Sequence, residues 1–171
     1  MSRITSILCQ VITGRVSGAG TDGNVYLGLG GREFLLDSTA DDHERGNERD
    51  YIMGGAPFES ELEPPLIRVR NKDKNDPREG FPLDTVDLNR APVYIRFEPE
   101  GPNDNWNLSF AAALVYAGSF VVGYTPPTGF DNLWLGRVMG KILYLTDEHR
   151  PLRQTGADQR LLDVGRKLAA R

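Results

Sequence analysis

Residue types that would define a function class are scarce in this sequence of 171 residues. A single cysteine, Cys9, excludes an intramolecular disulfide and a cysteine-rich zinc site. The two histidines, His43 and His149, lie far apart, and neither an H-E-x-x-H pair nor a G-x-S-x-G turn is present. We therefore expect no enzymatic activity. We expect the thiol of Cys9 to be buried and both histidines to be solvated on the surface.

Long apolar runs and a strong net charge are also missing. No stretch approaches the roughly 18 apolar residues that cross a bilayer, and the start of the chain lacks the hydrophobic core of a secretory signal. We therefore expect a soluble, cytoplasmic protein. The formal net charge of −4 gives no overall field to attract nucleic acid, so no nucleic-acid partner is expected. The sequence identifies no small-molecule substrate.

Glycine and proline are plentiful instead, with 19 and 11 residues. Between them lie short apolar segments rich in β-branched and aromatic residues, several of which alternate with a period of two. Such a pattern is typical of an all-β antiparallel sandwich or barrel. The predicted strands are 6–13, 24–29, 33–36, 50–53, 66–70, 83–88, 93–97, 106–116, 133–135 and 142–145.

The chain divides into a predicted β-domain at 1–150 and a tail at 151–171. Residues from about 54 to 80 form a proline-rich insertion. In the tail, Asp158 is a helix-capping residue, and Leu161, Val164 and Leu168 fall on one face of a short helix. This helix either docks on the β-domain or binds a partner or an anionic surface.

Two segments resemble known binding motifs but lack features that those motifs require. Gly18, Gly20 and Gly23 spell G-x-G-x-x-G, but a strand-like segment follows where a dinucleotide site needs a helix. Residues 71–76 resemble the start of an EF-hand loop. The sixth position there should be glycine and the twelfth glutamate, yet Asp76 and Pro82 occupy them.

Acidic residues concentrate in the first part of the chain. Between Asp22 and Glu63 there are eleven Asp/Glu and three Lys/Arg. Loops 18–22, 41–44 and 103–105 each lie at the end of a predicted strand, and alternate loops of a sandwich gather at one end. Their oxygens suit a hard cation such as calcium. The alternatives are an ordinary solvated acidic surface and a hydrolase that uses Asp41 and Asp42 as an acid–base pair.

Three segments resemble the polycystin–lipoxygenase–alpha-toxin (PLAT) domain. Residues 13–26 match its opening, roughly T-G-x-x-x-G-A-G-T-D-x-N-V-Y. Leu36-Asp37, Glu44-Arg45-Gly46 and Asp50-Tyr51 are similar to its next signature, and residues 96–108 are similar to a later strand, acidic loop and tryptophan. The resemblance covers about residues 4–116. The insertion at 54–80 and the chain after 118 depart from the family pattern.

The resemblance implies a two-sheet antiparallel β-sandwich that binds a calcium ion at one end. By motif position the metal ligands would be Asp22, Asp41, Glu44 and Asp104, and Gly18 and Gly20 would let backbone carbonyls turn toward the ion. Residues 15–17 stand where membrane-docking members carry exposed aromatic side chains.

The resulting hypothesis is a calcium-binding, non-catalytic module that docks onto a protein partner within a larger assembly. One alternative is calcium-dependent peripheral binding to anionic membranes, and a second is a carboxylate-based hydrolase.

Overall fold

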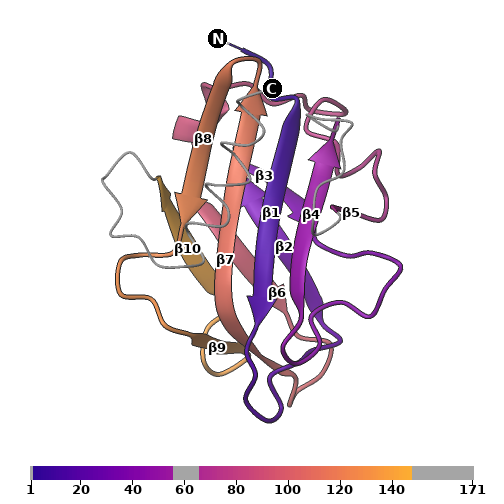
Figure 1. Ribbon diagram of the computed structural model, residues 1–171, viewed down its shortest axis with the longest axis vertical. Helices are drawn as coiled ribbons and strands as arrows, with labels where there is room; N and C mark the ends of the chain where they lie inside the picture. Colours follow the sequence, from indigo (N-terminus) through magenta and orange to yellow (C-terminus); the bar gives the residue numbers. More distant parts are fainter. Residues whose placement is uncertain (1, 56–65, 148–171) are drawn as a thin grey trace.

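A computed structural model describes residues 2–55 and 66–147 (Figure 1). Within these ranges the chain forms ten strands and one short 3-10 helix, which confirms the all-β prediction. The elements are β1 (Ser6–Thr13), β2 (Asn24–Leu29), β3 (Arg32–Leu35), β4 (Glu48–Gly54), β5 (Ile67–Arg68), η1 (Asp87–Asn89), β6 (Val93–Glu98), β7 (Asn105–Ala117), β8 (Phe120–Thr125), β9 (Leu133–Gly136) and β10 (Ile142–Asp147).

The strands form two layers that share β10. The first sheet has the order β3-β2-β6-β10 and the second β5-β4-β1-β7-β8, with β9 beside the start of β7. Residues Ile142–Leu145 of β10 pair with β6, whereas Thr146 and Asp147 pair with β8. Figure 1 shows β8, β7, β1 and β4 in front of β2, β3 and β6. The predicted β-sandwich is confirmed. Its described strand pairs are antiparallel except for β4 with β5.

Alternation along the long strands builds the core between the layers. In β1, the side chains of Ile7, Cys9 and Val11 point inward, and each is at most 1% exposed. Phe97 of β6 and Trp106 of β7 meet them from the two sheets, with ring centroids 5.8 Å apart. The Cys9 thiol is buried as predicted, and burial raises its pKa far above the usual value, which leaves it an inert apolar side chain.

One predicted strand was wrong, and one observed strand was missed. Residues 83–88 form turns leading into η1, because the Asp87 carboxylate accepts from the Asp84 amide (2.9 Å) and the Asp84 carboxylate accepts from the Val86 amide (2.9 Å). Such local side-chain bonds compete with a strand ladder. Strand β8 was not predicted. Its sequence, Phe-Val-Val-Gly-Tyr-Thr, begins with three apolar residues in succession and so lacks a clear period of two. In the structure, Phe120 and Val121 are both exposed.

Several predictions concern residues outside the described ranges. The tail helix at 151–171, including its cap Asp158, lies there, as do His149 and residues 56–65 of the insertion. The domain boundary near 150 therefore stays a prediction. Within the described ranges, no helix has the length and apolar character needed to cross a bilayer.

The described part of the insertion joins the edges of the two sheets. After β5, the Arg70 amide donates to the Asp37 carbonyl (2.7 Å) beyond the end of β3. The Asn75 side chain, 5% exposed, accepts from the Leu35 amide of β3 (2.9 Å) and donates to the Arg70 carbonyl (2.8 Å). One amide side chain thus satisfies two backbone groups that would otherwise lose water without gaining a partner.

Asn75→Ala should therefore lower the free energy of unfolding by about 2–4 kcal/mol, since it leaves two backbone groups unpaired in a buried site. Urea unfolding followed by tryptophan fluorescence measures the change. Lys74→Ala is the matched control because Lys74 is exposed. Equal stabilities of the Asn75→Ala and Lys74→Ala variants would show that the insertion does not tie the sheets together.

Candidate metal centre

Three loops meet at the lower end of the sandwich in Figure 1. They are 14–23 between β1 and β2, 36–47 between β3 and β4, and 99–104 between β6 and β7. Backbone hydrogen bonds join the first two: the Gly46 amide donates to the Gly14 carbonyl (2.9 Å) and the Thr21 amide to the His43 carbonyl (3.3 Å). The loops that the sequence predicted to carry ligands therefore lie at the same end.

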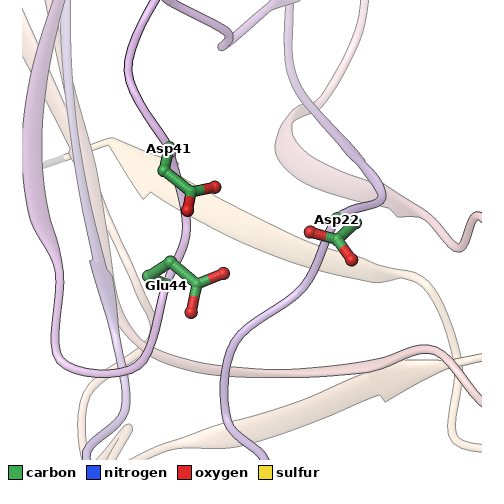
Figure 2. A group of neighbouring side chains, drawn as sticks. All are labelled: Asp22, Asp41 and Glu44. Atoms are coloured by element: carbon green, nitrogen blue, oxygen red, sulfur yellow. The ribbon is translucent and has the colours of Figure 1, made fainter.

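The structure brings Asp22, Asp41 and Glu44 together. One carboxylate oxygen from each lies within 4.8 Å of the other two, and all three residues are exposed. Figure 2 shows Asp41 and Glu44 on one loop and Asp22 on the facing loop, with the carboxylates directed into the space between. We call these three residues the carboxylate triad.

Within the described ranges, no Lys or Arg side chain forms an ion pair with the triad. Among the described residues, no ion pair or side-chain hydrogen bond uses its carboxylate oxygens. The neighbouring acidic residues differ: Asp42 pairs with Arg49 (3.1 Å) and accepts from the Ser38 amide. Two like charges 4 Å apart repel by roughly 1 kcal/mol in water, so a third close carboxylate adds to an unfavourable cluster that a bound cation would relieve.

The glycines of loop 14–23 allow the close approach of the two loops. Gly18 has a φ of +73°, which favours glycine. A β-carbon on Gly20 would lie 3.0 Å from the Arg45 amide nitrogen and 3.2 Å from the Glu44 Oε2 atom. A larger residue at position 20 would therefore push the loop carrying Glu44 away. Direct use of the Gly18 and Gly20 carbonyls as ligands stays a prediction.

Asp104 lies beside the triad but holds the loops together. Its Oδ1 atom accepts from the Thr21 hydroxyl (2.7 Å) and its Oδ2 atom accepts from the Glu100 amide (2.8 Å). With Asp22 and Glu44, it lines an open cavity of about 350 Å³. A carboxylate oxygen has a second lone pair, so these bonds do not prevent metal binding. Its ligand role stays a prediction, and its observed role is to join loop 99–104 to loop 14–23.

His43 is buried, and the expectation that it is solvated was wrong. It is 4% exposed and has a φ of +63°, which turns the ring into the protein. Its ring Nε2–H donates to the Leu36 carbonyl (2.8 Å), because a carbonyl can only accept, and the ring packs edge-on against Trp106 (5.5 Å, 67°). Burial lowers the pKa of His43, so the ring is neutral near pH 7.

The same histidine fixes the backbone of the ligand loop. Its carbonyl accepts from the Thr13 hydroxyl (3.2 Å), and that hydroxyl accepts from the indole Nε1–H of Trp106 (3.0 Å). In the sequence, His43 lies between Asp41 and Glu44 and directly precedes Glu44. No signal in the sequence predicted this role, because a histidine flanked by acidic residues has the pattern of a surface loop.

The geometry suits cation binding better than acid–base chemistry. The triad offers several exposed oxygens, which is the donor set that calcium prefers. The proposed acid–base pair does not converge in the same way. The Asp42 side chain is only 5% exposed and is held by Arg49, whereas Asp41 belongs to the exposed triad.

Comparisons with known proteins bear on the fold. No protein-family model and no curated protein matches the chain. Among solved structures, the chain is similar to the alpha toxin from Clostridium absonum, with 23% identity and a TM-score of 0.50 over 85% of this chain and 32% of the toxin. This chain therefore corresponds to about a third of the toxin's length.

Two solved lipoxygenase structures are also similar. One is coral 8R-lipoxygenase, described as activated by calcium via a C2-like domain, with 14% identity and a TM-score of 0.45 over 95% of this chain and 20% of the enzyme. The other is a lipoxygenase in complex with arachidonate, with 16% identity and a TM-score of 0.46 over 94% and 20%. The strand arrangement and the likeness to alpha toxin together show that the chain has a PLAT-like β-sandwich fold.

Proposed function

We propose that this chain is a calcium-binding, non-catalytic module that docks onto a protein partner within a larger assembly. The observation that carries the calcium assignment is the carboxylate triad: three exposed acidic groups from two facing loops, whose carboxylates form no ion pair among the described residues. The match to only 32% of the alpha toxin chain supports a role as a module.

The donor chemistry fits calcium. Calcium takes six to eight oxygen ligands in flexible geometry. Asp22, Asp41 and Glu44 would supply carboxylate oxygens, with Asp104, backbone carbonyls and water as further candidates. The loops are already joined through Thr21 and His43. Binding would therefore require little ordering of the backbone, and it would remove the repulsion within the triad.

Calcium should bind to the wild-type chain and raise its melting temperature, and Asp22→Ala should abolish both effects, because a ligand that binds only the folded state stabilises it. Calorimetric titration and thermal melts measure the two effects. Asp131→Ala is the control, since Asp131 is exposed and lies outside the triad. If the wild-type chain takes up no calcium at millimolar concentration, the metal proposal fails.

The roles of Asp22 and Asp104 should differ without calcium. Asp104→Asn should lower the melting temperature of the calcium-free chain, because an amide cannot replace both accepting oxygens toward Thr21 and Glu100. Asp22→Asn should leave it unchanged or raise it, because one repelling charge is lost. Thermal melts in a chelator test the difference. Equal melting temperatures for the two variants would contradict the holding role of Asp104.

A second candidate function is calcium-dependent binding to an anionic lipid surface, and one feature favours it. In the turn between β9 and β10, Val138 and Met139 are 93% and 55% exposed, and Arg137 and Lys141 flank them. This turn lies at the end of the sandwich that carries the triad, because Gly136 pairs with Asn105 at the start of β7. Exposed apolar residues between cations suit an anionic membrane interface.

Co-sedimentation with phosphatidylcholine/phosphatidylserine vesicles tests this candidate. The wild-type chain should pellet with calcium and stay in solution without it, and the double variant Val138→Asp, Met139→Asp should pellet at least tenfold less. Phe81→Asp is the control, because Phe81 is 84% exposed but contacts Arg32 at the other end of β2. The absence of calcium-dependent pelleting by the wild-type chain removes the lipid candidate and leaves protein docking.

A further inference from the structure

The second sheet carries buried apolar clusters on both of its faces. Because side chains alternate along a strand, Ile7 of β1 and Val115 of β7 point into the main core, whereas Leu8 and Leu114 point to the opposite face. That outer face, turned toward the viewer in Figure 1, carries a second buried group. We call it the outer cluster: Leu8, Ile52, Ala112, Leu114 and Tyr116. Leu8 pairs with Ile52 on one side and Leu114 on the other, so the row crosses three strands.

The outer face of the first sheet is different. There Glu33 and Arg96 form an ion pair (2.6 Å), the Arg96 guanidinium lies 4.2 Å from the ring centre of Tyr26, and Tyr144 is 54% exposed. A sheet with one face in water alternates apolar and polar side chains in this way. The outer cluster breaks that alternation, which indicates that its face is not built to contact water.

The burial of the outer cluster requires a covering layer. Its five side chains are between 0% and 5% exposed. Neighbouring strands flank a side chain but do not cap it. In the described ranges, the partly buried apolar side chains packed against the cluster are Phe110, which belongs to β7 itself, and Leu66, which precedes the edge strand β5. The centre of the row therefore needs another occupant.

We propose that the chain's own C-terminal segment, residues 148–171, docks on the outer cluster. The described chain ends at Asp147, which pairs with Tyr124 of β8, and β8 is the neighbour of β7. The segment therefore begins at the sheet that carries the cluster. From β8 to the centre of the row on β1 is two strand spacings, about 10 Å. Ten extended residues span up to roughly 33 Å, so the ten residues before Asp158 are long enough to reach the cluster.

The residue pattern of the segment matches an apolar face. Leu161, Val164 and Leu168 recur at the spacing of one helix face. A helix of this kind buries its apolar stripe against a sheet, and most of its stability comes from that packing. Without a surface to pack on, so short a helix is marginal in water.

Charge also favours this occupant. The segment contains six Lys/Arg and three Asp/Glu. One end of the outer face carries Glu48 and Asp50, which lie on β4 beside Gln10. Burial raises the pKa of Asp50 to about 6, which is consistent with a covered position. A basic segment crossing this face would be attracted to its acidic end.

Methyl NMR on the full-length chain tests the proposal directly. Nuclear Overhauser contacts are expected between the methyl groups of Leu161, Val164 or Leu168 and those of Leu8, Ile52 or Leu114. Isotope-filtered spectra of mixed labelled and unlabelled chains separate contacts within one chain from contacts between copies. If contacts are seen only between copies, the outer cluster is covered by a second copy of the chain in a dimer. If contacts are seen only from Leu62, the outer cluster is covered by the insertion. Either result, or no contact, overturns the proposal.

Two charge variants provide a second measurement. Leu161→Glu with Leu168→Glu should release the segment, so trypsin should cleave within it at least tenfold faster and the chain should bind a hydrophobic dye. Gln159→Glu with Ala170→Glu adds the same charge on the opposite helix face and should behave like the wild-type chain. Near-ultraviolet circular dichroism of Trp106 and Trp134 reports whether the sandwich stays folded. Equal cleavage of all three chains would contradict docking.

Discussion

The structure depends on the burial of Trp106 between the two sheets. An indole that is fully buried still needs a partner for its N–H group, and the Thr13 hydroxyl accepts that bond at 3.0 Å. The same hydroxyl donates to the carbonyl of His43, whose ring packs on the indole. One core side chain therefore fixes both the end of β1 and the loop between β3 and β4, and the position of the acidic loops follows from the packing of the core.

This framework divides the acidic residues of the loops into two kinds. Asp42 and Asp104 accept hydrogen bonds from other parts of the loops and hold them in place. The carboxylates of Asp22, Asp41 and Glu44 form no ion pair among the described residues and remain exposed. A loop end that is ordered by its own bonds before an ion arrives loses less conformational entropy on binding. The proposed site would therefore be largely formed without calcium.

Sequence reasoning located most strands but only part of the site. Strands β1 and β2 were predicted with their observed bounds because alternation along a strand is a local property. The nearness of Asp22 to Asp41 and Glu44 depends on loops far apart in the chain. Sandwich topology predicted that these loops share one end, and the resemblance to a family singled out the ligand residues. His43 was predicted to lie on the surface, because its burial depends on a positive φ and on Trp106, 63 positions away. Neither condition leaves a mark in the nearby sequence.

The exposure of the triad has a consequence for the proposed function. Water screens the repulsion among three exposed carboxylates, so the cluster can exist without a cation, whereas a buried one would be forced to protonate. The same exposure limits how firmly an ion is held, because solvent supplies the remaining ligands. On the proposed function, calcium would offset two of the three negative charges of the triad and so weaken the negative field at this end of the molecule. Without the ion the triad would repel an anionic surface, and with it this repulsion would be weaker, so Arg137 and Lys141 at the same end would contribute more to binding. Calcium would then control attachment by charge, with little change of shape.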